Sequence, residues 1–65
     1  MDIIKEVKIC NTFFLTIVYF EDIKEYEVQF SNNDDILDTD GTYSNKKDTI
    51  KVFNQWLKEL IVKVE

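Results

Sequence analysis

The apolar residues of this chain change their spacing once, from a period of two residues to a helical period. Between Lys24 and Phe30, polar and apolar residues alternate, as expected of a strand with one buried face. After Asn45, apolar residues recur every three or four positions, which is typical of one face of a helix. Strands that precede a helix indicate an α+β domain.

Two further segments precede this alternating strand and predict a sheet of consecutive antiparallel strands. Residues 2–10 form a mixed segment, and residues 13–20 are apolar on both faces. We expect a hairpin loop at residues 10–12 between them, with Asn11 in the left-handed conformation that asparagine tolerates.

A tight turn at residues 22–23, with Glu21 opposite Lys24, sets the register of the second hairpin. A slip of one residue would move every side chain to the other face, so one register is strongly favoured. In the first hairpin, the predicted loop sets Ile3 opposite Tyr19. The predicted core face then collects ten apolar residues: Ile3, Val7, Ile9, Phe13, Leu15, Ile17, Tyr19, Tyr26, Val28 and Phe30. Lys5 shares this face, which an edge position would accommodate.

The second half of the chain predicts one helix and a possible short strand. Residues 36–37 are a candidate fourth strand, which a turn at residues 40–41 would end. Helix start signals lie at Ser44 and Asn45. The apolar stripe of the helix comprises Ile50, Phe53, Leu57, Leu60, Ile61 and Val64. We therefore predict an α+β fold for residues 1–65 as a single domain: an antiparallel three- to four-stranded β-meander with one C-terminal α-helix packed on one face.

The short length restricts how this domain can be stabilised. Domains of about 65 residues often need disulfides, a metal or self-association. Cys10 is the single cysteine and histidine is absent, which excludes a disulfide framework and a zinc site. We therefore expect a dense core or self-association, with no metal and no cofactor. A lone thiol fits a reducing compartment, so a cytoplasmic location is expected, in the host cytosol for a phage-encoded protein. The longest apolar run is shorter than the ~20 residues of a membrane-spanning helix, so no membrane partner is expected.

The charge narrows the classes of partner. The net charge is −5, and all eight basic residues are lysine. Direct nucleic-acid binding is disfavoured, because it needs a basic surface and usually arginine. An acidic chain is compatible with a basic protein partner, although the same charge can serve solubility alone.

One face of the predicted sheet has no helix to cover it. It holds an apolar set beside two acids, and together they form a candidate partner-binding patch: Ile4, Phe14, Val18 and Phe20, with Glu25 and Glu27. A sheet face open to solvent normally alternates to polar residues, so an apolar patch with a charged rim indicates an interaction site. Alternatively, the tail or a loop covers the second strand.

A run of acids and a tryptophan are further partner-binding candidates. The acids are Asp34, Asp35, Asp38 and Asp40. A calcium loop that uses Gly41 fails, because Ile36 and Lys47 occupy its first and last ligand positions. The acids are therefore either a solvated loop or an acidic docking surface. Trp56, at the flank of the helical stripe, is either an interface anchor or a residue that closes the core.

No residue set predicts catalysis. Without histidine, no base is available to activate a serine or the thiol, and one glycine cannot make a phosphate-binding loop. We expect a non-enzymatic, small acidic protein-binding module: an inhibitor or adaptor of the phage or mobile-element type that antagonises a nucleic-acid-binding host protein. The alternative is a structural homodimer that self-associates through the face of Phe14, Val18 and Phe20.

Overall fold

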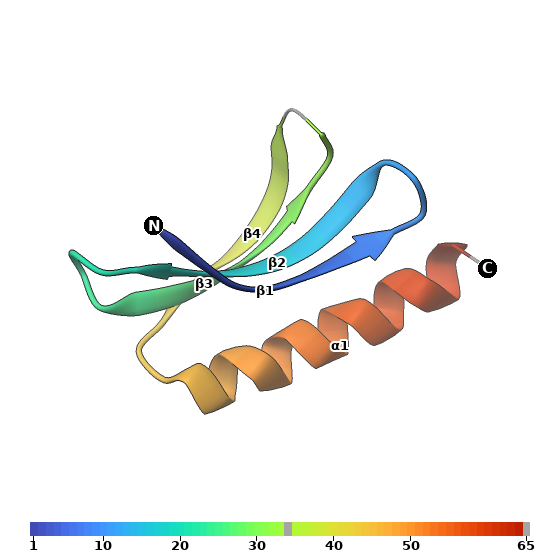
Figure 1. Cartoon of the computed structure of the whole chain (residues 1–65). Coiled ribbons are helices and arrows are strands. Elements are labelled where there is room, and N and C mark those ends of the chain that lie inside the picture. The colour runs from blue at the N-terminus through green and yellow to red at the C-terminus, as the bar shows by residue number, and fades with distance from the viewer. Residues whose placement is uncertain (34, 65) are drawn as a thin grey trace.

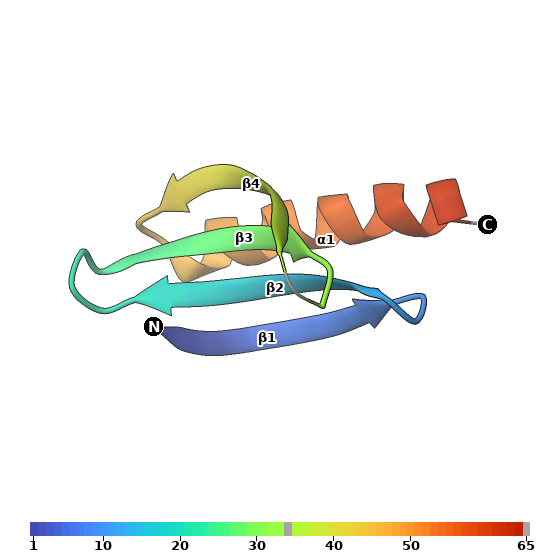
Figure 2. The same cartoon turned by 90° about the horizontal axis from the view of Figure 1, so that it is seen from above.

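A computed structural model describes residues 1–33 and 35–64, with side chains described as far as Leu60, and this part of the chain forms four strands and one helix (Figure 1). The elements are β1 (Asp2–Ile9), β2 (Phe13–Phe20), β3 (Glu25–Ser31), β4 (Ile36–Tyr43) and α1 (Lys46–Val64). The strands form one antiparallel sheet in the order β1-β2-β3-β4, and α1 crosses one of its faces (Figure 2). The predicted α+β meander with a C-terminal helix is confirmed.

The β2–β3 hairpin has the predicted register. Leu15 pairs with Phe30, Ile17 with Val28 and Tyr19 with Tyr26. The ladder ends at the pair of Phe20 and Glu25, so residues 21–24 form a longer turn than predicted. Lys24 closes this turn with a positive φ of 54°.

The β1–β2 hairpin departs from the predicted register at one end. Val7 pairs with Leu15 as expected, but the register shifts between Ile3 and Lys5. Ile3 therefore pairs with Val18 instead of Tyr19, and its side chain lies on the face away from the helix with 60% of its surface exposed. The assignment of Ile3 to the core is wrong, because an extra residue at a bulge reverses the faces beyond it.

The β1–β2 loop also differs from the prediction in its backbone. Cys10, not Asn11, takes the left-handed conformation, with a φ of 59°. The geometry of the loop that joins the two strands determines which residue takes the left-handed conformation. The preference of asparagine for this conformation was therefore not sufficient to predict the position.

β4 is longer than the predicted short strand. Thr39 pairs with Gln29 and Thr42 pairs with Glu27, so Asp40 and Gly41 together oppose the single residue between these partners. This is a β-bulge, and Gly41 supplies its positive φ of 77°. The prediction that Asp40 and Gly41 end the strand is wrong, because the same residues that favour a turn also favour a bulge.

The helix begins where the cap residue predicts. The Oδ1 atom of Asn45 accepts hydrogen bonds from the backbone N–H groups of Lys47 (2.8 Å) and Asp48 (3.3 Å). Thr49 donates its hydroxyl to the Asn45 carbonyl oxygen at 2.8 Å. These bonds satisfy N–H groups that have no partner inside the helix, so the helix start is locally encoded.

The core lies between α1 and the sheet. Its buried cluster comprises Ile9, Leu15, Ile17, Val28 and Phe53. Of the predicted helical stripe, Ile50, Leu57 and Leu60 pack against this cluster, whereas the side chains of Ile61 and Val64 lie outside the described ones. Lys5 on the edge strand β1 places its Nζ atom 5.1 Å from the centre of the Phe53 ring, which explains how the core face tolerates a lysine.

Candidate protein-binding surfaces

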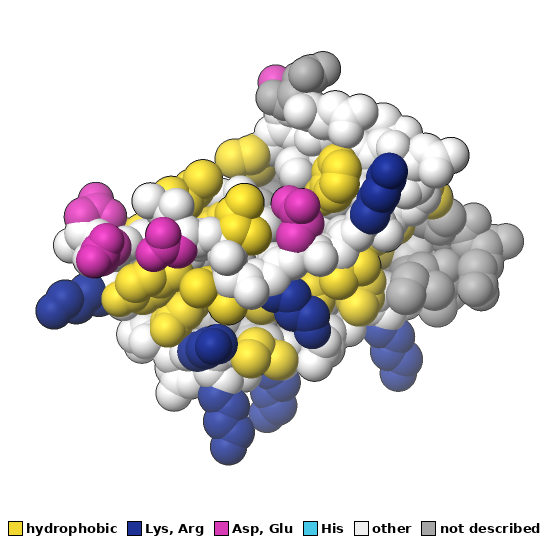
Figure 3. Space-filling model, in the orientation of Figure 1, with side chains coloured by type: hydrophobic (Ala, Val, Ile, Leu, Met, Phe, Trp, Pro, Cys, Tyr) yellow, Lys and Arg dark blue, Asp and Glu magenta, His cyan; other side chains and the backbone are white. Residues whose placement is uncertain are grey.

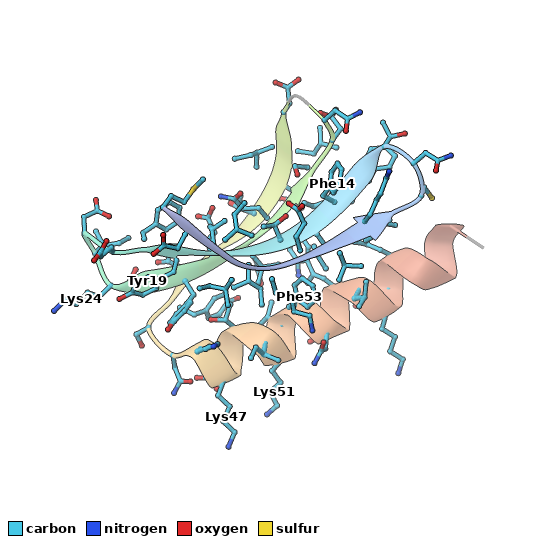
Figure 4. The ribbon with its side chains drawn as sticks, viewed as in Figure 1. Phe14, Tyr19, Lys24, Lys47, Lys51 and Phe53 are labelled. Atoms are coloured by element: carbon cyan, nitrogen blue, oxygen red, sulfur yellow. The ribbon has the colours of Figure 1, made fainter. Side chains whose placement is uncertain are left out.

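The face of the sheet away from α1, here called the open face, follows from the strand register. Its side chains come from all four strands: Ile3, Glu6 and Lys8 of β1; Phe14, Thr16, Val18 and Phe20 of β2; Glu25, Glu27, Gln29 and Ser31 of β3; Ile36, Thr39 and Thr42 of β4. Figure 4 shows Phe14 on this side of the sheet and Phe53 on the other, next to α1. The open face therefore combines an apolar row on β2 with an acidic and polar row on β3.

The apolar row is less exposed than the alternation suggests. Val18 is 1% exposed and Thr16 is 5% exposed, although α1 lies on the other side of the sheet. The sheet is curved, and the β3–β4 hairpin rises on the open-face side (Figure 1) and passes over β2 when seen from above (Figure 2). The register contributes to this burial, because Val18 lies between the longer side chains of Ile3 and Glu27. Cross-strand neighbours are only about 5 Å apart at their β-carbons, so long neighbours shield a short side chain.

The other apolar residues of the predicted patch remain partly accessible. Phe14 and Phe20 are half-buried near the two ends of β2. Ile4 lies at the bulge of β1 and is 39% exposed, next to the more exposed Ile3. The sequence did not predict Ile3 as part of this surface, because only the bulge places it there.

Glu25 and Glu27 lie within the open face, not at its rim. They belong to β3, an inner strand of the sheet, and pair with Phe20 and Val18 on β2. Both side chains are half-buried. A partner on this face would therefore contact their carboxylates together with the aromatic residues beside them.

Neutral donors hold the carboxylates of the open face. Glu25 accepts a hydrogen bond of 2.5 Å from the hydroxyl of Thr42, and Glu27 accepts one of 2.7 Å from the Gln29 amide. Glu6 accepts a longer bond of 3.3 Å from the Thr16 hydroxyl. A hydroxyl or amide orients a carboxylate without cancelling its charge, and each carboxylate keeps further acceptor sites.

The predicted acidic run is distributed along the β3–β4 hairpin. Asp34 lies outside the described residues. Asp35 is exposed, and its N–H donates to Asn32 Oδ1 at 2.7 Å in the turn. Asp38 pairs with Phe30, so it lies on the helix side of the sheet, whereas Asp40 lies at the bulge. The described acids therefore do not form one cluster.

Asp40 has a specific partner. Its Oδ2 atom accepts a hydrogen bond of 2.7 Å from the Tyr43 hydroxyl. This bond, partial burial and the nearby negative charge raise the pKa of Tyr43 above its ordinary value.

Trp56 is half-buried against the core and also lines a groove. The groove has a volume of about 360 Å³ and is lined by Phe30, Asp38, Trp56, Glu59 and Leu60. Trp56 therefore packs on the core, as one of the two predictions has it, and stays partly accessible, whereas its role as an interface anchor stays a prediction. Sequence analysis missed Phe30 and Glu59 at this place, because strand and helix positions meet only in the folded chain.

The charges of the chain are divided between sheet and helix. Residues 1–45 contain three lysines and ten acidic residues, whereas residues 46–65 contain five lysines and three acidic residues. Lysine side chains extend from the helix side of the molecule in Figure 3, and Lys47 and Lys51 point away from the sheet in Figure 4. Lys47 and Lys51 therefore leave the acids of the open face available to a partner.

Within residues 1–33 and 35–64, no group of three or more acidic or cysteine side chains is arranged to hold a metal ion. In the same part of the chain, no helix has the length and apolar character needed to cross a membrane. No protein-family model matches the sequence, and neither a curated protein nor a solved structure matches it.

Proposed function

We propose that this chain is a non-enzymatic protein-binding module that binds a basic protein surface on its open face. The observation that carries this proposal is the set of carboxylates at Glu6, Glu25 and Glu27, which neutral hydroxyl and amide donors orient on one face. Half-buried Phe14 and Phe20 lie beside them.

The combination suits recognition of a protein. Opposite charges across an interface speed association and select the partner, whereas aromatic residues supply much of the affinity. The open face has both, and the acids need no rearrangement because their hydrogen bonds already hold them. Binding therefore costs little side-chain ordering at these positions.

The proposed partner is a cytoplasmic protein whose basic surface otherwise binds nucleic acid. Such surfaces carry lysine and arginine for contact with phosphates. An acidic protein that occupies them acts as a competitive inhibitor. The distribution of charge supports this role, because Lys47 and Lys51 of α1 point away from the sheet (Figure 4).

The experiment uses an immobilised chain to capture partners from nuclease-treated extract, followed by elution with double-stranded DNA. We expect Glu25→Gln/Glu27→Gln to lose capture of every protein that DNA elutes from the wild type. Glu21→Gln/Asp22→Asn removes the same charge from the exposed β2–β3 turn and is the matched control, which should retain capture. Equal capture by both double variants, or captured proteins that DNA does not elute, would contradict the proposal.

The homodimer predicted as the alternative gives a different result in solution. Self-association of two open faces would bring Glu25 and Glu27 of both copies into one interface, where like charges repel. We therefore expect a monomer when molar mass is measured across a wide range of concentration. A dimer that Phe20→Asp converts to a folded monomer would favour the alternative.

A further inference from the structure

A groove lies on the opposite side of the sheet from the open face, between the β3–β4 hairpin and the second half of α1. Phe30, Trp56 and Leu60 contribute its apolar surface. Asp38 of β4 and Glu59 of α1 contribute one carboxylate each, and both side chains are exposed. The groove therefore combines aromatic and aliphatic contact with two negative charges from different elements.

The chain itself shows what fits between this sheet and helix. At the β1 edge, Lys5 extends over the ring of Phe53, with its Nζ atom 5.1 Å from the ring centre. A cation at this distance from an aromatic ring is attracted by the ring electrons. At the β4 edge, the groove places aromatic rings beside two carboxylates, and both kinds of group attract a cation.

We propose that this groove binds an arginine side chain of a basic protein partner. The guanidinium group is planar, stacks on aromatic rings and forms paired hydrogen bonds with carboxylates. Phe30 and Trp56 are half-buried, so part of each ring is accessible to it. Lysine carries the same charge on a compact ammonium group and lacks the stacking surface, so arginine is preferred.

The inference rests on the proposed function only in taking the partner to be a basic protein. The site itself is separate, because Asp38 pairs with Phe30 on the helix side, whereas Glu25 and Glu27 lie on the open face. The two surfaces can therefore be tested independently.

The test uses the fluorescence of Trp56, which is the only tryptophan of the chain and lines the groove. The probe is a short peptide of alternating arginine and glycine, compared with peptides that carry lysine or uncharged citrulline instead. We expect a saturable change in emission with the arginine peptide, weaker binding of the lysine peptide and no saturable change with citrulline.

The variants locate the response. Asp38→Asn/Glu59→Gln should weaken arginine-peptide binding by about tenfold, on the order expected for lost charge-assisted hydrogen bonds. Glu21→Gln/Asp22→Asn removes the same charge at the β2–β3 turn and should bind within about twofold of the wild type, since screening weakens distant charges. Circular dichroism of each variant checks that it is folded, and the single variants Asp38→Asn and Glu59→Gln replace the double variant if it is not.

Three results would overturn the inference: no saturable change with the arginine peptide, equal binding of arginine and lysine peptides, or equal weakening by the groove and turn variants. Glu25→Gln/Glu27→Gln should leave the fluorescence response within about twofold of the wild type, because it alters only the open face. If that variant loses partner capture, but the arginine peptide causes no change in the Trp56 fluorescence of the wild type, the groove proposal is refuted and the proposed function stands. If the arginine peptide changes the Trp56 fluorescence, but DNA elutes no captured protein, the proposed function is refuted and the groove proposal stands.

Discussion

The contact between Asp40 and Tyr43 depends on the bulge that separates them. Residues three apart in a regular strand point to opposite faces. The extra residue at the bulge of Asp40 and Gly41 brings the two side chains to one side, where the tyrosine hydroxyl donates to the carboxylate. The raised pKa of Tyr43 is therefore a property of one local irregularity.

This contact predicts a pH effect that Asp40→Asn should reduce. The pKa of Tyr43 is raised above the ordinary value of about 10, so its contribution to folding is complete below about pH 10 and is lost as the pH rises through the folded-state pKa. Removing the charge of Asp40 lowers that pKa. We expect NMR titration of the Tyr43 ring to show a lower midpoint in the variant, and the wild type to lose more stability between about pH 9 and about pH 11. Identical Tyr43 midpoints in the two proteins would contradict this explanation.

At the scale of the element, β4 is an edge strand with two irregularities. Its register against β3 shifts once around Gly41. It shifts again between the pair of Phe30 with Asp38 and the pair of Ser31 with Ile36. Bulges and charged side chains such as Asp38 and Asp40 make an edge a poor template for another strand. β4 is therefore protected against pairing with a strand of another molecule. A partner at this edge would instead contact its side chains.

Gly41→Ala tests the backbone requirement of this strand. A β-carbon at Gly41 would meet no atom within 4 Å, but the φ of 77° is unfavourable for alanine. We expect a loss of about 1–2 kcal/mol in the free energy of unfolding, measured by urea denaturation. Gly41→Asn should lose less, because asparagine tolerates left-handed conformations. Equal losses for both variants would indicate a cause other than backbone conformation.

At the scale of the whole molecule, one helix supplies the second layer of the core. Phe53 is fully buried and belongs to the same cluster as Ile17 and Val28 of the central strands. The open face has no second helix among the described residues, and the β3–β4 hairpin rises on its side of the sheet (Figure 1). The helix side therefore supplies the main core cluster, whereas on the open face Val18 is buried and Phe14 and Phe20 stay partly accessible to a partner.

Phe53→Ala should consequently be severe. Loss of a fully buried phenylalanine costs about 3–5 kcal/mol, most of the stability of a small domain. Phe53→Leu keeps more of the volume and should lose less, and Gln55→Ala on the exposed side of α1 should change stability by less than about 0.5 kcal/mol. Urea denaturation measures all three. A fully folded Phe53→Ala variant with a midpoint near that of the wild type would show that the core lies elsewhere.

The candidate surfaces could be predicted only in part. The alternation of β3 placed Glu25 and Glu27 on the face away from the helix, and the structure has them there. The exposure expected of Val18 did not follow, because it depends on the lengths of its neighbours on two other strands. The groove at Trp56 forms where β3, β4 and α1 meet. The spacing of residues along the chain does not predict that these three elements meet there.

The sequence by itself determined the features that depend on neighbours along the chain. The register of β2 against β3 followed from two apolar periods joined by a short turn, and the start of α1 followed from the side chain of Asn45. Only the tertiary structure decided where the ladders slip, and hence that Ile3 leaves the core and that Asp40 and Gly41 stay within β4. A bulge forms when it improves pairing with a partner strand, so its cause lies in residues that are distant in sequence.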